Sequence, residues 1–120
     1  MAKDRSHTDG QILKGLLDTL VLDVLQDGPN YGFGIRERLR EMLGEDAELV
    51  KEATLYPLLH RLERRGLLAT HYEPGKRGTP RKYYRLTLEG EEFRATRIRE
   101  WSRIARLLER TVLRREEDDE

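Results

Sequence analysis

The chain has 120 residues, of which 37% are hydrophobic, so it can build one small domain with an extension. Its 23 lysines and arginines balance 23 aspartates and glutamates, and the net charge alone therefore does not indicate a nucleic-acid partner. The absence of cysteine excludes disulfides, thiol redox sensing and thiolate metal sites.

Residues 1–10 are polar and show no periodicity, so we expect a flexible N-terminal arm. The arm contains Lys3 and Arg5, and a DNA contact by these residues stays open beside the simpler disordered start. No hydrophobic export segment is present, and no apolar run approaches the roughly 20 residues that span a bilayer. We therefore expect a cytoplasmic protein without membrane contact.

Two helices are predicted after the arm. Leucines and valines recur at helical spacing from Ile12 to Gln26, and the sequence Asp27-Gly28-Pro29 ends this helix. A second helix is expected from about Gly32 to Leu43. The glycine-rich segment 28–34 between them follows a helix rather than a strand, so it lacks the context of a dinucleotide-binding loop and is interpreted as a turn. The residues expected on the core face of the second helix are Phe33, Ile35, Leu39 and Met42.

The segment 54–66 has the most informative pattern. Its leucines at positions 55, 58, 59 and 62 fall at i, i+3, i+4 and i+7, which places them on one stripe of a helix. We expect Thr54 to cap this helix, Pro57 to be tolerated in its first turn and Gly66 to end it. The face away from the leucines is basic and aromatic. It carries Pro57, His60 and Arg64, with Tyr56 and Arg61 on its flanks.

Two short strands are predicted next, at residues 67–73 and 81–86. The loop between them contains turn residues and two cations, Lys76 and Arg77. Between His60 and Arg85, eight lysines and arginines face two glutamates, a local charge of +6. A helix followed by a hairpin with a basic tip is the arrangement of a winged helix-turn-helix. The expected fold class is therefore mainly α (α+β), with a two-stranded wing.

Several short motifs resemble the PadR family of transcriptional regulators. In order, they are Thr54-Leu55-Tyr56-Pro57, His60-Arg61-Leu62-Glu63, Gly66-Leu67-Leu68, and Arg81-Lys82-Tyr83-Tyr84-Arg85-Leu86-Thr87 with Gly90. The similarity extends from about Leu13 to the end of the last helix. Phe33 and Gly34 depart from it, because the family pattern has a tyrosine and a larger residue there.

A long last helix is predicted from about Leu88 to Arg114, with Thr87 as its cap and an acidic disordered tail at residues 115–120. Its length of roughly 40 Å exceeds what the domain core needs, so part of it must find another surface. A dimer contact and a helix folded back on its own domain are the two alternatives. The apolar seam consists of Ile98, Trp101, Ala105, Leu108 and Val112. Resemblance to small PadR proteins implies that this helix pairs with the partner's first helix, at Leu13, Leu16 and Leu17.

The domains expected are thus an arm (1–10), a winged helix-turn-helix (11–87), a dimerisation helix (88–114) and the tail (115–120). The predicted function is a homodimeric transcriptional regulator, by resemblance a repressor, that binds an inverted-repeat operator in double-stranded DNA. Tyr56, His60, Arg61 and Arg64 are placed to reach base edges, and Pro57 shapes that contact. Thr54, Lys76, Arg77 and Arg81 are placed to hold phosphates, and Lys82 completes the set at the wing. For each cation, a merely solvated charge is the alternative.

Other functions are weighed on the same residues. Resemblance to small PadR regulators implies that Trp101 stacks on a planar hydrophobic effector, whereas the simpler alternative is that it only fills an interface. An adaptor that uses the winged helix without DNA is a second class of function. The inventory does not favour an enzyme, a cofactor or a metal sensor. The three histidines are scattered, and no carboxylate pair lies in a recognisable cleft.

Overall fold

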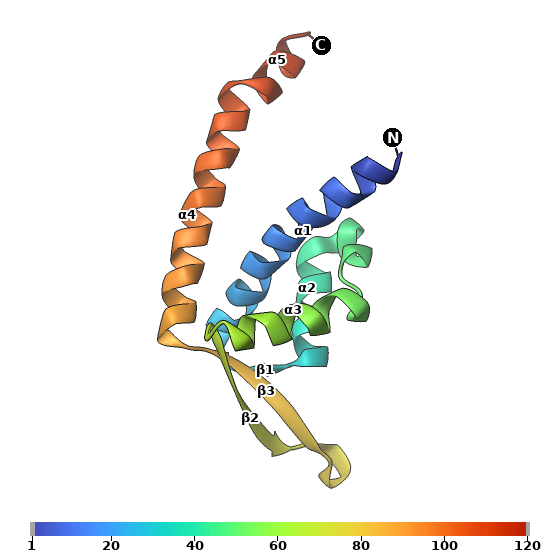
Figure 1. The fold of residues 1–120 in the computed structure, drawn as a ribbon, viewed down its shortest axis with the longest axis vertical. Coiled ribbons are helices and arrows are strands. Elements are labelled where there is room, and N and C mark those ends of the chain that lie inside the picture. Colours follow the sequence, from blue (N-terminus) through green and yellow to red (C-terminus); the bar gives the residue numbers. More distant parts are fainter. Residues whose placement is uncertain (1, 120) are drawn as a thin grey trace.

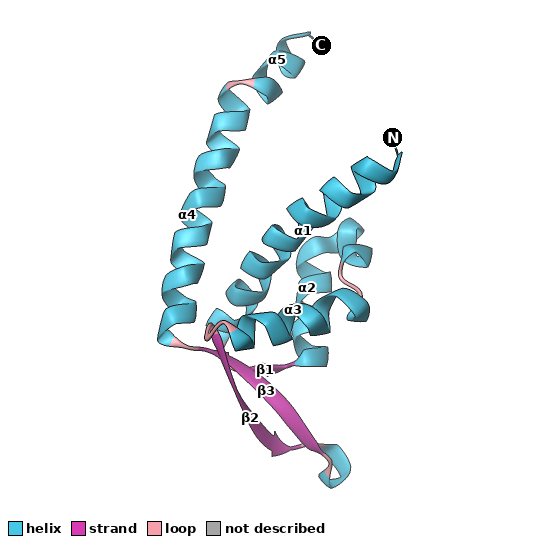
Figure 2. Cartoon of the chain, in the orientation of Figure 1, coloured by secondary structure: helices cyan, strands magenta, loops and turns pink. Residues whose placement is uncertain are grey.

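The computed structural model describes the backbone of residues 2–119 and the side chains of residues 12–115. Helices dominate, and a small antiparallel sheet lies at the end opposite the two termini (Figures 1 and 2). The molecule is elongated, with a longest dimension of 59 Å. In chain order the elements are α1 (Ala2–Val24), the 3-10 turn η1 (Leu25–Asp27), β1 (Asn30–Tyr31), α2 (Gly32–Leu43), η2 (Gly44–Leu49), α3 (Glu52–Arg64), β2 (Leu68–Pro74), η3 (Lys76–Gly78), β3 (Pro80–Leu86), α4 (Leu88–Arg110) and α5 (Val112–Asp119).

The leucine stripe of α3 forms the centre of the hydrophobic core. Leu55, Leu58, Leu59 and Leu62 are each at most 2% exposed, as their spacing predicted. With this stripe buried against α1 and α2, the opposite face of α3 is left at the surface. The buried core residues outside α3 are Leu17, Val21, Leu22, Val24, Leu25, Ile35, Leu39, Val50, Leu67, Leu68 and Tyr84.

The sequence predicted a flexible arm at residues 1–10, and α1 includes the backbone of residues 2–10, because this helix begins at Ala2. Extending a helix adds one hydrogen bond for each residue fixed, and the apolar stretch that follows supplies the costly nucleus. No proline in residues 2–10 stops the extension. Met1 and the side chains of Lys3 and Arg5 lie outside the described part of the chain.

The second helix has the predicted bounds, but its core face is narrower than expected. Ile35 and Leu39 are fully buried, whereas Phe33 is 53% exposed and Met42 is 46% exposed. Phe33 precedes Ile35 by two positions, and about 100° per residue places the two side chains on nearly opposite sides of the helix. The assignment of Phe33 and Met42 to the core was therefore wrong, and an aromatic ring is left at the surface.

The start of α3 also differs from the prediction. Its N-cap is Lys51, and Thr54 lies inside the helix, where its amide donates to the Lys51 carbonyl at 2.9 Å. Thr54 is therefore not the cap. Pro57 accordingly falls in the helix interior rather than in the first turn. Because Pro57 and Ala53 are both exposed, water can satisfy the Ala53 carbonyl that the proline leaves without a donor.

The C-terminus of α3 leads directly into the sheet. Gly66 has φ 78°, and the amides of Gly66 and Leu67 donate to carbonyls of the last turn at 3.0 Å each, which is a Schellman motif. Thr87 fastens the start of α4 to this turn. Its hydroxyl donates to the Gly66 carbonyl at 2.7 Å and accepts from the Gly90 amide at 3.0 Å. Gly66 as helix stop and Thr87 as cap are therefore confirmed.

The sheet has three strands in the order β1-β3-β2, one more than the predicted two-stranded wing. β1 consists of Asn30 and Tyr31, which pair with Tyr84 and Tyr83 of β3. Two residues are too few to show a strand pattern, so the sequence did not reveal this strand. We call β2, β3 and the turn between them the wing. The alternation predicted for β3 is confirmed, because Tyr84 is 6% exposed and its neighbours Tyr83 and Arg85 are more exposed.

The last helix ends earlier than predicted. α4 stops at Arg110, and Thr111 adopts φ −115° and ψ −97°. The Thr111 hydroxyl donates to the Leu107 carbonyl at 2.8 Å, a local bond that competes with the helical pattern and favours a bend. The chain then forms α5, which includes the backbone of residues 115–119 where the sequence predicted a disordered tail, and Glu120 lies outside the described residues. Among residues 2–119, no helix combines the length and apolarity that crossing a bilayer requires.

Candidate nucleic-acid interface

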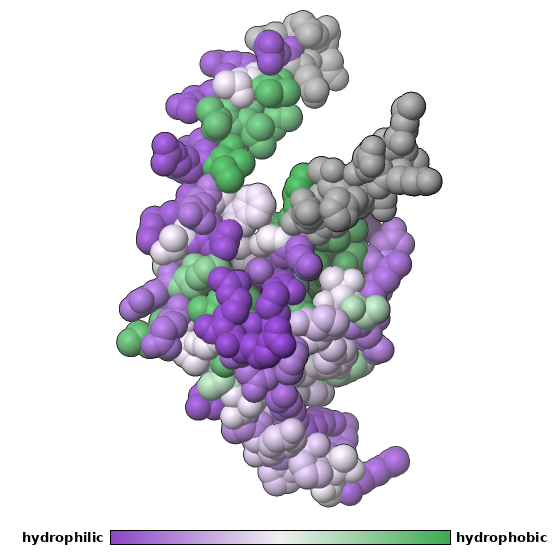
Figure 3. Space-filling model, viewed as in Figure 1, coloured by the Kyte–Doolittle hydropathy of each residue, from purple (hydrophilic) through white to green (hydrophobic). Residues whose placement is uncertain are grey.

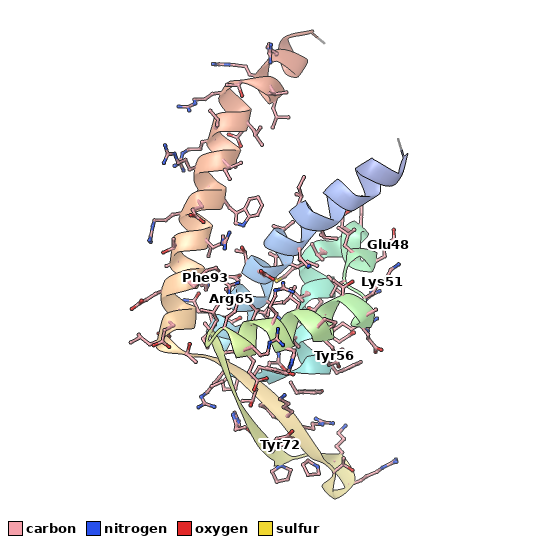
Figure 4. All side chains as sticks on the ribbon, in the orientation of Figure 1. Glu48, Lys51, Tyr56, Arg65, Tyr72 and Phe93 are labelled. Atoms are coloured by element: carbon pink, nitrogen blue, oxygen red, sulfur yellow. The ribbon has the colours of Figure 1, made fainter. Side chains whose placement is uncertain are left out.

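The exposed face of α3 carries aromatic and basic side chains. Tyr56, Pro57, His60 and Arg64 are all exposed, as predicted from the leucine stripe. Tyr56 leans toward α2, since a Cβ atom on Gly32 would lie 2.8 Å from the tyrosine hydroxyl oxygen. Figure 4 shows Tyr56 on the side of α3 that faces the sheet. The face therefore presents one aromatic ring, one imidazole and one guanidinium to a partner.

The tip of the wing adds two exposed cations, Lys76 and Arg77. The Gly75 amide donates to the Thr79 carbonyl at 2.8 Å, which closes the turn that carries them. Arg77 is the only described non-glycine residue with positive φ, at 62°, a backbone conformation that occurs mainly in turns. Figure 1 shows the wing projecting from the helical body.

Glu63 joins α3 to both strands of the wing. Its Oε2 accepts from the Thr70 hydroxyl of β2 at 3.3 Å, and its Oε1 accepts from the Lys82 ammonium of β3 at 3.4 Å. The Lys82 nitrogen also lies 5.3 Å from the centre of the Tyr84 ring. Burial lowers the pKa of Lys82, but interactions with Tyr84 and Glu63 outweigh it and leave that pKa raised. Lys82 therefore keeps its charge and is partly engaged within the protein.

Arg61 lies differently from the other basic residues of α3. Its Nη2 donates to Oδ1 of Asp18 on α1 at 2.7 Å, and the Asp18 side chain is only 12% exposed. The structure thus directs Arg61 toward α1 and not toward the face predicted to read bases. Asp18 was missed in the sequence, although a carboxylate within an apolar helical stripe is itself a signal of a buried ion pair.

Trp101 rests on α1 of its own chain. Its indole Nε1 donates to the Thr19 hydroxyl at 2.9 Å, and its ring approaches Gly15, where an added Cβ atom would lie 3.9 Å from it. Trp101 is half-buried by these contacts. The Thr19 hydroxyl satisfies the indole N–H.

Further contacts hold α4 to the body of the domain. Arg94 donates to Asp23 of α1 through two nitrogens, at 2.6 and 3.1 Å. The Phe93 ring lies between two guanidiniums, with Arg65 of α3 at 4.9 Å and Arg97 at 4.7 Å from its centre. Figure 4 shows Arg65 and Phe93 together at the base of α4. The end of α3 and the start of α4 are therefore in direct contact.

Beyond Trp101, α4 leaves the body and exposes an apolar side (Figure 3). The predicted seam residues Leu108 and Val112 are 42% and 44% exposed, and Ala105 is also exposed. Ile98 is half-buried. On α1, Leu13 and Leu16 line a shallow groove of about 300 Å³ together with Ile12 and Leu49. Leu17 is only 2% exposed, so it belongs to the core and its predicted place in an interface was wrong.

Comparisons with known proteins agree with this architecture. The Transcriptional regulator PadR-like family matches residues 21–96. A transcriptional regulator from Clostridium thermocellum is 30% identical, with a TM-score of 0.74 over 85% of this chain and 98% of that one. A PadR-like transcriptional regulator from Bacillus cereus is 26% identical, with a TM-score of 0.74 over 85% of this chain and 96% of that one. An uncharacterised Lysinibacillus sphaericus protein is 29% identical over 82% of this chain and 89% of its own. The chain therefore belongs to the PadR-like family of transcriptional regulators.

Proposed function

We propose that this regulator binds operator DNA with the exposed face of α3 and with the wing. The observation that supports this most is the pairing of a buried leucine stripe with an outward face of Tyr56, His60 and Arg64, beside the wing cations Lys76 and Arg77. In this arrangement α3 enters the major groove and the wing follows the backbone. Tyr56, His60 and Arg64 contact base edges, Pro57 stiffens that turn, and Lys76, Arg77 and Arg81 contact phosphates.

Three residues of the predicted DNA-binding set have altered roles in this proposal. Arg61 is removed from it, because Asp18 engages its guanidinium at 2.7 Å. Thr54 is half-buried within α3, so its contribution to DNA binding is limited to a phosphate contact near the start of the helix. Lys82 forms an ion pair with Glu63, and its main role is to position the wing.

A homodimer accounts for the exposed apolar side of α4 and of the start of α5. Ile104, Leu107, Leu108 and Val112 are 42–48% exposed in the single chain, and such a row of exposed apolar residues is typical of an interaction surface. A partner whose first helix offers Leu13 and Leu16 would cover it. Two-fold symmetry then presents two α3 helices to inverted half-sites about 34 Å apart. By similarity to the family, the bound dimer acts as a repressor.

An effector site beside Trp101 is part of the same proposal. The indole joins α1 to α4 next to the exposed row of α4, so a planar hydrophobic molecule there would contact both helices. Fluorescence of Trp101, the only tryptophan, reports such binding. A compound that releases DNA without changing this fluorescence would place its site elsewhere.

A mobility-shift titration tests the function. The labelled probe is the DNA upstream of the gene for this protein, and unlabelled duplex of unrelated sequence is the competitor at low salt. A specific regulator gives a complex that resists the competitor, and sedimentation in the absence of DNA gives the mass of two chains. An adaptor without a DNA surface ignores both duplexes, which would refute the proposal.

A further inference from the structure

A groove of about 370 Å³ lies where the start of α2, the side of α3 and the wing meet. Aromatic rings from all three parts line it, and two cations border it. We call it the aromatic groove. Its rings are those of Tyr31, Phe33, Tyr56 and Tyr84, and its cations are Arg81 and Lys82.

Two of these rings are exposed without contributing to the core. Phe33 is 53% exposed and Tyr56 is 43% exposed, whereas Tyr84 is 6% exposed and belongs to the core. Phe33 stacks on Tyr31 at a centroid separation of 6.4 Å, and about half of its surface stays open to water. Packing of the core does not account for two exposed rings that line one groove, but recognition of a partner does.

The two cations of the aromatic groove favour an occupant that carries negative charge. The Arg81 guanidinium lies 4.6 Å from the centre of the Tyr31 ring, which fixes it beside the opening. Lys82 keeps its positive charge and also lines the groove. The occupant therefore combines negative charge at its margin with an apolar part that fits between aromatic rings. The groove is also continuous with the DNA-binding face, since Tyr56 and Arg81 belong to both.

We propose that Phe33, together with Tyr56, reads the 5-methyl group of a thymine in the operator. Of the base edges in the major groove, only that of thymine offers a methyl group, and the others offer hydrogen-bond donors and acceptors. Phenylalanine has no polar group to meet those edges, so its side chain favours thymine over cytosine at the same position. The phosphate next to this thymine contacts Arg81. This inference rests on the proposed DNA-binding function and adds a specificity-determining residue to it.

The test replaces thymine by uracil, which removes only the methyl group. The probe is the tightest-binding duplex recovered from a random-sequence DNA pool, resynthesised with deoxyuridine at each thymine in turn. Loss of one buried methyl group is worth about 0.8 kcal/mol, so uracil at the contacted position weakens binding by the wild type about fourfold. Phe33→Ala binds the thymine duplex about as weakly as the wild type binds the uracil duplex, and does not distinguish the two.

Met42→Ala is the matched control, since Met42 is an exposed apolar residue of the same helix outside the groove. It retains the fourfold preference. Equal binding of thymine and uracil duplexes by the wild type overturns the inference and leaves the DNA-binding function intact. A preference that persists in Phe33→Ala overturns the role of Phe33. Absence of any duplex binding refutes the proposed function and this inference together.

Discussion

The carboxylate of Asp18 on α1 accepts a hydrogen bond from the guanidinium of Arg61 on α3, at 2.7 Å. The next residue of α1, Thr19, accepts the indole N–H of Trp101 from α4. One turn of α1 therefore holds both the proposed recognition helix and the long C-terminal helix. The Asp18–Arg61 pair therefore adds a charged contact between α1 and α3 to the packing of the four buried leucines of α3.

We expect Asp18→Asn to lower the free energy of unfolding by about 1–3 kcal/mol, because the half-buried guanidinium of Arg61 loses its charged partner. Urea unfolding measures this loss. Asp27→Asn is the control, since the Asp27–Arg38 pair has the same charges but is 66% and 46% exposed, and its removal changes stability by less than about 1 kcal/mol. Equal effects of the two variants would show that Asp18 does not anchor α3.

Arg64 extends from the exposed face of α3, and the described structure gives it no ion pair. If its guanidinium grips a guanine, Arg64→Ala weakens operator binding by about 1–3 kcal/mol and relaxes the preference at that base pair. Titration of the operator and of single-base variants measures both effects. Arg103→Ala, at an exposed position of α4, is the control. An unchanged dissociation constant for Arg64→Ala would contradict its assignment.

The wing tip is proposed to bind phosphates, which predicts a change in salt dependence. Replacing Lys76 and Arg77 by glutamine weakens binding to every duplex, and the slope of log K against log salt becomes less steep by about 0.9 for each lost phosphate contact. Operator and unrelated duplex are titrated over a range of salt concentrations. The pair Arg103→Gln with Arg106→Gln removes the same charge from α4 and leaves the slope unchanged. A wild-type slope in the wing variant would remove the tip from the interface.

The sequence predicted those parts of the fold that depend on local periodicity and on special backbone positions. The leucines of α3 are buried because a helix places i, i+3, i+4 and i+7 on one side. Gly66 and Thr87 were identified because a helix end leaves amides and carbonyls without partners, and few residue types satisfy them. These signals lie within a few residues of where they act.

The parts that the sequence did not reveal depend on contacts between distant segments. Arg61 was assigned to the DNA face because it flanks the leucine stripe, but its partner Asp18 lies 43 positions earlier. The pairing of Lys82 with Glu63 and the packing of Trp101 on α1 are long-range in the same way. A helical pattern gives the angular position of a side chain, and it does not show which neighbour lies there.

Tyr84 and Lys82 make the stability of the fold change with pH in the alkaline range. Burial raises the pKa of Tyr84 above its ordinary value of 10.0, and the pKa of Lys82 is raised above 10.5. Above about pH 10 the unfolded chain releases these protons while the folded chain keeps them, so stability is full below that pH and decreases above it. Urea unfolding is measured between about pH 9 and about pH 11, on either side of the ordinary tyrosine pKa of about 10. Over this range the stability of Tyr84→Phe decreases less than that of the wild type. Tyr72→Phe, at a 68% exposed position, serves as control, and an unaltered pH dependence in Tyr84→Phe would contradict the prediction.

Replacement by alanine is expected to have opposite effects on stability at Gly90 and at Gly15. A Cβ atom at Gly90 would collide with the carbonyl oxygen of Leu67, which also accepts the Thr87 amide at 3.2 Å. Because a backbone carbonyl cannot move aside as a flexible side chain can, Gly90→Ala displaces the start of α4. The collision lowers the free energy of unfolding by about 1–3 kcal/mol. The higher helix propensity of alanine offsets at most about 1 kcal/mol of this loss.

At Gly15, by contrast, the added methyl group meets only the Trp101 ring, at an ordinary contact distance of 3.9 Å. Gly15→Ala therefore stabilises α1 by about 0.5–1 kcal/mol through helix propensity. Urea unfolding of both variants at one protein concentration compares the two signs directly. If Gly90→Ala were as stable as Gly15→Ala, α4 would not be held against the turn at Leu67 as closely as the structure places it. The glycine of the family motif would then need another explanation.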